Sequence, residues 1–239
     1  MASRQEEKAQ RRREREAAEK AAASAGSRNK RVQLALAAFL GIAVIVGVVI
    51  VVAGGGSDKG SMAGTGNPTS GTSGAALPPV RTRDLATAAK AAGCTTSSPK
   101  IEGSTHVTTK VTYGTNPPTS GNHNPDPSLD GVYEPGDTPE PEHYVHALEH
   151  GRVEIQYKKG TSAKIISQLE TLANEPLNGK DAYKVLLFEN NTNMPYDVAA
   201  TAWGQLIGCK TFNEKDFDAL RAFRLKYVDK GTEIIPPNN

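Results

Sequence analysis

Cysteine is scarce in this sequence: among 239 residues there are only Cys94 and Cys209. Two cysteines so far apart do not have the Cys-x-x-Cys spacing of zinc ligands or of thioredoxin-like redox pairs. In an oxidising compartment an isolated pair is most simply a disulfide, and one that closes so long a loop stabilises the folded state by about 4 kcal/mol. The sequence therefore predicts a Cys94–Cys209 disulfide.

Several enzyme motifs are missing as well. No phosphate-binding loop, dinucleotide fingerprint or Gly-x-Ser-x-Gly elbow is present. Residues 120–123 spell the letters of a hydrolase class, but in that class the letters stand for residues from four separate blocks. The basic N-terminal segment has no aromatic residues among its charges, so nucleic acid is not an expected partner.

The sequence does contain a run without charge at residues 34–53. About twenty residues are needed for a helix to cross a hydrocarbon core of about 30 Å. We therefore predict a transmembrane helix over residues 32–53. The long basic stretch before it favours a retained single-pass anchor over a cleaved signal peptide.

Charge predicts the orientation of this anchor. Residues 1–31 carry ten Lys or Arg against five Glu, so the positive-inside rule keeps them in the cytoplasm. Residues 54–79 are rich in Gly, Ser and Pro and are expected to form a flexible linker. Residues 80–239 then form one extracytoplasmic domain at the cell membrane, large enough to bury its own core.

The domain pattern predicts an α+β fold with a mostly antiparallel sheet and two or three helices. Asp84 is expected to cap the first helix, and Asn213 the last. The alternation Val-Glu-Ile-Gln-Tyr at 153–157 is typical of a half-buried strand. The predicted helices are 85–92, 162–173 and a segment after 213; the predicted strands are 105–113, 153–157, 183–188 and 198–207.

Four of the five histidines fall within residues 123–150. On a strand, His146 and His150 would lie about 13 Å apart, whereas on a helical turn they would be neighbours. We predict such a turn, with His123, His146 and His150 binding zinc or copper. Glu149 and Met194 are additional candidates as ligands or supporting residues.

Two other interpretations stay open. In the first, the histidines bind no metal and fasten the Pro-rich loop by hydrogen bonds to backbone carbonyls, leaving that loop for a protein partner in the cell envelope. In the second, residues 146–150 match His-x-x-Glu-His, the inverted zinc-protease motif, with Glu149 activating water. Gly151 and the strand pattern after it end any helix too early for that chemistry, so an enzyme is less favoured and no catalytic residue is predicted. His106 and His143 are expected to be exposed.

Several short motifs also point to a family. These motifs are PPTSGNH at 117–123, GVY at 131–133, HALEHG at 146–151, MP at 194–195 and TAWG at 201–204. They resemble a family of membrane-anchored proteins, mostly from high-GC Gram-positive bacteria, known only as a domain of unknown function. The resemblance covers roughly residues 80–239 and implies architecture and topology but no activity.

Overall fold

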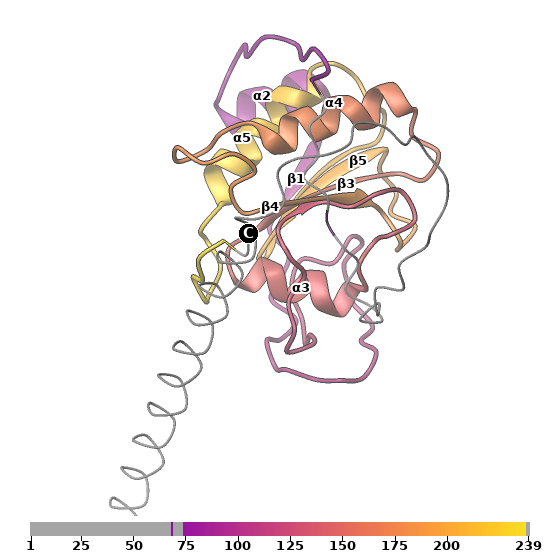
Figure 1. Cartoon of the computed structure of the whole chain (residues 1–239), viewed down its shortest axis with the longest axis vertical. Coiled ribbons are helices and arrows are strands. Elements are labelled where there is room, and N and C mark those ends of the chain that lie inside the picture. The colour runs from indigo at the N-terminus through magenta and orange to yellow at the C-terminus, as the bar shows by residue number, and fades with distance from the viewer. Residues whose placement is uncertain (1–67, 69–73, 238–239) are drawn as a thin grey trace, which may run out of the picture. The chain divides into compact units, whose positions relative to one another are not determined.

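The computed structural model describes residue 68 and residues 74–237. This part contains four α-helices and a six-stranded mixed sheet (Figure 1), so the predicted α+β class is confirmed. There is one helix more than predicted, because the histidine segment is itself a helix. The helices are α2 (Leu85–Ala92), α3 (Pro141–Glu149), α4 (Ala163–Asn174) and α5 (Asp216–Tyr227), and the strands are β1 (Thr95–Ser97), β2 (Gly131–Val132), β3 (Val153–Tyr157), β4 (Val185–Glu189), β5 (Val198–Ala202) and β6 (Gln205–Cys209).

The predicted cytoplasmic segment 1–31, the predicted transmembrane helix 32–53 and most of the predicted linker 54–79 lie outside the described residues. Within the described part, every helix is too short or too polar to cross a bilayer.

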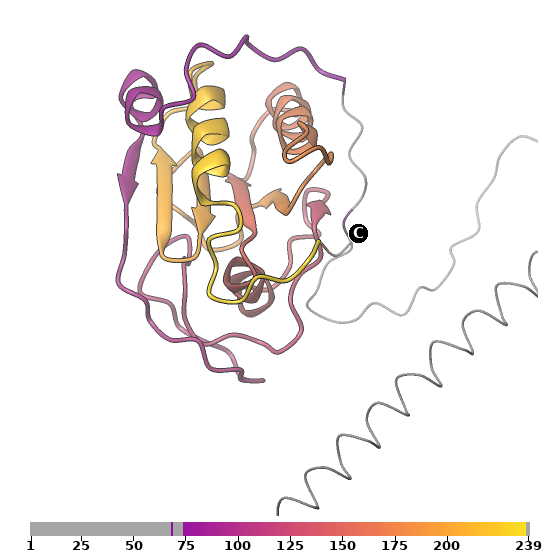
Figure 2. The same cartoon turned by 90° about the vertical axis from the view of Figure 1, so that its left-hand side faces the viewer.

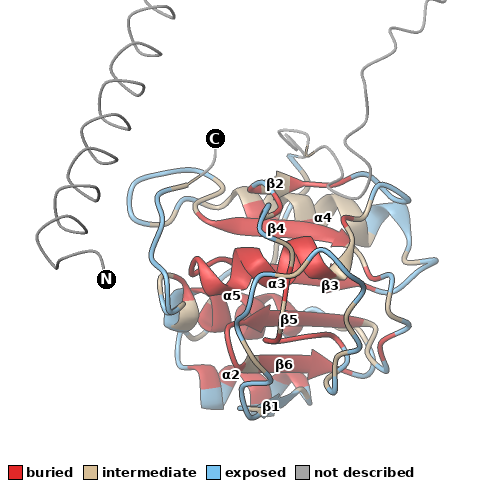
Figure 3. Cartoon of the chain, turned by 90° about the horizontal axis from the view of Figure 1, so that it is seen from below, coloured by how far each residue is buried: buried red, intermediate tan, exposed pale blue. Residues whose placement is uncertain are grey.

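The strand order is β1-β6-β5-β3-β4-β2. β1, β6, β5 and β3 pair antiparallel, while β3, β4 and β2 pair parallel. Helices α2, α4 and α5 cover one face of the sheet, and α3 covers the other face (Figures 1 and 2). Seen from the α3 side, that helix and the strands beneath it are buried (Figure 3).

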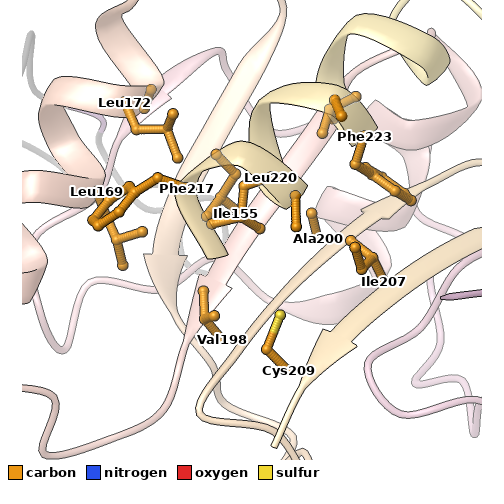
Figure 4. Close-up of a cluster of buried hydrophobic side chains, with 14 of the residues drawn as sticks. Ile155, Leu169, Leu172, Val198, Ala200, Ile207, Cys209, Phe217, Leu220 and Phe223 are labelled. Atoms are coloured by element: carbon orange, nitrogen blue, oxygen red, sulfur yellow. The ribbon is translucent and has the colours of Figure 1, made fainter. Parts of the chain in front are cut away.

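The larger core lies between the sheet and α2, α4 and α5 (Figure 4). Alternate strand residues such as Ile155, Ala200 and Ile207 meet helix residues such as Leu169 and Leu220, and all five are fully buried. Burying a side chain of leucine size is worth about 1.5–3 kcal/mol, so this layer supplies most of the hydrophobic stabilisation.

Local sequence explains two of these helices directly. Asp84 accepts a hydrogen bond from the backbone N–H of Thr87 at 2.8 Å, as predicted, and α2 ends before Gly93, which has a φ of 75°. Ser162 caps α4 in the same way through the N–H of Ile165. The prediction that Asn213 caps the last helix is wrong: Lys215 is at the N-cap of α5 without a side-chain cap, and the side-chain oxygen of Asn213 accepts from the N–H of Lys215 in the turn before the helix.

Three strand predictions need correction. Residues 105–113 form no strand; they make only a single bridge, between His106 and His123. Residues 198–207 are not one strand but the hairpin β5–β6, because Gly204 takes a φ of 64° and turns the chain back. β3 is where predicted but is buried on both faces instead of one, since Glu154 and Gln156, on the face away from the apolar core, are fully buried as well.

Cys94 and Cys209 form a disulfide, which confirms that prediction. The bond joins Cys94, just after α2, to Cys209, the last residue of β6, across a sequence separation of 115 residues. It therefore ties the first helix of the described domain to β6, the strand next to the edge strand β1.

Candidate metal site

The histidine segment folds as α3, as the helical-turn prediction requires. Pro141 occupies the first helical turn, where its missing N–H costs nothing, and Gly151 follows the helix with a φ of 81°. The rings of His146 and His150 lie one turn apart with centroids separated by 4.3 Å. α3 thus presents both imidazoles from one side of the helix.

A long irregular loop brings His106 and His123 to the same place. The N–H of Val107 donates to the carbonyl of His123 at 2.7 Å, and the N–H of His123 donates to the carbonyl of Thr105 at 3.1 Å. The loop is fastened to α3 by the N–H of Asn124, which donates to the carbonyl of Glu142 at 3.0 Å. Backbone pairing, not side-chain packing, therefore sets the separation of these two histidines.

The β5–β6 turn completes the surroundings. The N–H of Gly204 donates to the carbonyl of Thr119 at 2.8 Å, which holds Trp203 against the loop. The indole of Trp203 lies edge-on to the His123 ring with centroids 6.0 Å apart. The PPTSGNH, HALEHG and TAWG segments, far apart in sequence, therefore meet at one site.

Backbone carbonyls fix the tautomer of three histidines. Nδ1 of His123 lies 2.8 Å from the carbonyl oxygen of Gly121, and Nδ1 of His146 lies 2.7 Å from that of Asn124. Nδ1 of His143 is likewise 2.6 Å from the carbonyl oxygen of Asp126. A carbonyl only accepts, so each Nδ1 carries the proton and a neutral ring keeps a lone pair on Nε2.

Four side chains converge on one point. His106, His123, His146 and Glu149 each offer a ligand atom, and these atoms all lie within 4.8 Å of one another. The ring centroids of the three histidines are 4.6–5.0 Å apart. Zinc bonds of about 2.0–2.1 Å place neighbouring ligand atoms roughly 3.3 Å apart, so a small inward movement closes the shell. His106 is exposed and can make that adjustment by changing rotamer, whereas the other three are buried.

His123 and Glu149 face each other in the buried part of this group. Nε2 of His123 lies 3.0 Å from Oε2 of Glu149, but the pair lacks hydrogen-bond alignment, and this buried nitrogen has no hydrogen-bond partner. The other oxygen, Oε1, accepts a hydrogen bond from the hydroxyl of Thr232 at 2.9 Å. A lone pair and a carboxylate oxygen that face each other in a buried site are the arrangement that a bound cation stabilises.

Burial keeps the imidazoles of His146 and His150 neutral. Desolvation, with the neighbouring His150 and His123, lowers the pKa of His146 to about 3. Desolvation, with the positive charge of Arg152, lowers the pKa of His150 to about 4, against an opposing effect of Glu233. Both rings are therefore unprotonated at neutral pH, which is the form that binds metal.

The other predicted site residues lie apart from this convergence. His150 is outside the group of four: its Nε2 lies 3.6 Å from a carboxylate oxygen of Glu233, and its Nδ1 is buried without a hydrogen-bond partner. Met194 packs in a separate apolar cluster with Ala199 and Leu206. Of the His-x-x-Glu-His motif, only the first histidine and the glutamate belong to the group.

The predictions that His106 and His143 are exposed have opposite outcomes. His143 is buried, because the loop packs over its ring and the carbonyl of Asp126 is hydrogen-bonded to it. His106 is exposed as predicted, yet it belongs to the group, a role the sequence reasoning missed. Sequence gave no signal for this role beyond the presence of a histidine. The backbone pairing that brings residue 106 next to residue 123 has no local sequence pattern.

Comparisons with known proteins give a family but no activity. Residues 106–234, more than half of the chain, match the model of the family described as "Protein of unknown function (DUF3105)". The match spans all four residues of the group and the TAWG turn. The search of curated proteins gave no match, and neither did the search of solved structures. The chain therefore belongs to the DUF3105 family.

Proposed function

We propose that this domain binds one transition-metal ion through His106, His123, His146 and Glu149. The observation that supports this best is the convergence of their ligand atoms within 4.8 Å. Hydrogen bonds of the His123 and His146 rings to backbone carbonyls orient them with Nε2 inward, as is usual for metal-bound histidine. The site differs from the sequence prediction by having His106 in place of His150.

The ligand chemistry favours zinc, with Cu(II) second. Imidazole suits both ions and a carboxylate oxygen is also a zinc ligand, whereas Cu(I) prefers sulfur. Both cysteines are in the disulfide, and Met194 lies in its own apolar cluster. Four protein ligands complete a tetrahedral shell, which is typical of structural or carrier sites and not of catalytic zinc, which keeps a position for water.

We infer from the sequence that this domain is held at the outer face of a cell membrane by residues 32–53. In that setting a metal site with three buried ligands and one exposed histidine suits sequestration or delivery of the ion. Delivery requires a ligand that can leave first, and the exposed His106 is that ligand.

A second candidate function has its own supporting observation. The carbonyl bonds of His143 and His146 fasten the irregular loop to α3, and that of His123 closes a turn within the loop, all without any metal. On this view the histidines are structural, and the loop faces a protein partner in the envelope. The two candidates differ in one measurable property, the metal content of the protein.

The test is elemental analysis of the full chain, purified in detergent without a polyhistidine tag and incubated with zinc or Cu(II). The wild type is expected to retain about one ion per chain after dialysis. Glu149→Gln keeps the shape of the side chain but removes its charge, and is expected to lose most of the metal. His143→Ala is the matched control, because it removes a buried ring bonded to the same loop but outside the group.

Retention of the metal by His143→Ala and its loss by Glu149→Gln would support the proposed site. Absence of both ions from the wild type would exclude metal binding and leave the loop-fastening role.

A further inference from the structure

The last described residues, 229–237, run across the end of α3; we refer to them as the C-terminal strap. The N–H of Asp229 donates to the carbonyl of Gly151 at 2.9 Å, and the N–H of Glu233 donates to the carbonyl of Glu149 at 3.0 Å. Between them, Gly231 lies so close that a Cβ there would be 2.0 Å from the carbonyl oxygen of Glu149. The strap is thus in direct backbone contact with a residue of the proposed site.

Buried charges anchor this strap at both ends. The guanidinium of Arg152 donates to the carbonyls of Ile235 at 3.2 Å and Pro236 at 2.7 Å, while its Nε pairs with Asp130 at 2.8 Å. At the other end, Asp229 pairs with the buried ammonium of Lys184. These contacts do not involve the four metal-site residues, so they hold the strap in place whether or not metal is bound.

Two consecutive strap residues reach the histidine site from behind. The hydroxyl of Thr232 donates to Oε1 of Glu149 at 2.9 Å, and the carboxylate of Glu233 lies 3.6 Å from Nε2 of His150. Because Thr232 holds Oε1, the remaining oxygen of Glu149 is the one directed at His123. The strap therefore selects which carboxylate oxygen faces the point of convergence.

Resting on the metal-binding function proposed above, we infer that Thr232 is a positioning residue of the metal site. Its hydroxyl fixes the carboxylate of Glu149 so that Oε2 is presented as a single-oxygen ligand. Residues that hydrogen-bond to metal ligands in this way typically contribute 10–100-fold to metal affinity. The proposal gives the C-terminal strap a function in ion binding in addition to its packing.

An effect of Thr232 on metal affinity can be separated from a general loss of folding. Thr232 is exposed, and its hydroxyl contacts Glu149 across a sequence separation of 83 residues. Thr232→Val keeps the branched shape and removes the hydrogen bond, whereas Thr232→Ser keeps the hydroxyl. Thr161→Val is a matched control. Thr161 is half-buried at the surface, and its hydroxyl donates to the backbone carbonyl of Lys158.

The experiment measures the zinc dissociation constant of the full chain by competition with a chromophoric chelator, together with the melting temperature of each metal-free protein. Thr232→Val is expected to bind zinc 10–100-fold more weakly than wild type, with Thr232→Ser near wild type and Thr161→Val unchanged. The metal-free melting temperature of Thr232→Val should match that of Thr161→Val.

Zinc binding by Thr232→Val as tight as that of wild type would overturn this inference and leave the proposed function intact. Absence of zinc binding in the wild type itself would overturn both. The two failures are therefore distinguished within one set of measurements.

Discussion

The two faces of the sheet differ in what they bury. The face under α2, α4 and α5 buries one continuous apolar core, beside which α5 buries a few charged groups such as Asp216 and Arg224. The face under α3 also buries charged and polar groups, including His123, His146, Glu149 and Glu154. A buried polar group is costly unless it is hydrogen-bonded or binds an ion, so the two faces contribute differently to stability.

A single strand makes the contrast plain. In β3, Ile155 points into the apolar core, while its neighbours Glu154 and Gln156 are buried on the opposite face of the sheet. Glu154 accepts hydrogen bonds from Thr201 at 2.8 Å and from Gln156 at 3.0 Å. Gln156 in turn accepts from Asn190 at 2.7 Å. The difference teaches that one face of the sheet stabilises the domain, while the other maintains a polar interior in which a site can form.

The largest expected effect comes from removing the disulfide on the apolar side. Changing both Cys94 and Cys209 to Ser should lower the free energy of unfolding by about 4–5 kcal/mol, because the bond closes a long loop in the unfolded chain. Urea unfolding under oxidising conditions measures this change. An unchanged midpoint would mean that the disulfide contributes little to the stability of this face.

The next effect is a cavity in the apolar core. Leu220 on α5 is fully buried, and Leu220→Ala should cost about 2–5 kcal/mol of unfolding free energy. Zinc affinity, measured at a temperature where the variant is still folded, should stay at the wild-type value because Leu220 belongs to the core on the opposite face from α3. A parallel loss of zinc affinity would show that the two faces are not independent.

A smaller effect concerns pH on the polar face. Burial raises the pKa of Glu154 well above its ordinary value, although hydrogen bonds from Thr201 and Gln156 oppose that shift. The Glu154 carboxyl therefore binds its proton more tightly in the folded protein than in the unfolded chain. The free energy of unfolding should fall as pH rises above the ordinary pKa range of glutamate. Glu154→Gln removes this titration.

Urea unfolding of metal-free wild type and Glu154→Gln between about pH 5 and pH 8 checks the sign. The stability of the variant relative to wild type should increase with pH. All other ionisable groups are the same in the two proteins, so their contributions cancel in the difference. Parallel stability curves would contradict the prediction.

Local signals allowed much of the fold to be predicted from sequence. α2 and α4 begin at the cap residues Asp84 and Ser162 because short-range hydrogen bonds decide those positions. The two-sided burial of β3 was not predictable, because alternation of polar and apolar residues normally marks a strand with one wet face. The β5–β6 hairpin was missed because its turn depends on the backbone conformation of Gly204 within a mostly apolar run.

Only part of the candidate site could be predicted from the sequence. His146 and Glu149 are three residues apart on one helix, a spacing that sequence reveals. His106 joins them through backbone pairing with His123, a contact between two irregular segments that follows no periodicity. Thr232 lies 83 residues from the glutamate it contacts, and no sequence pattern links them.

The central claim is that the polar face holds a metal ion between His106, His123, His146 and Glu149. X-ray absorption spectroscopy at the zinc edge, on the full chain loaded with one equivalent of zinc, tests it most directly. The account predicts only nitrogen and oxygen ligands at about 2.0–2.1 Å, with the scattering pattern of imidazole. A shell of water oxygens without imidazole, or sulfur at about 2.3 Å, would contradict it.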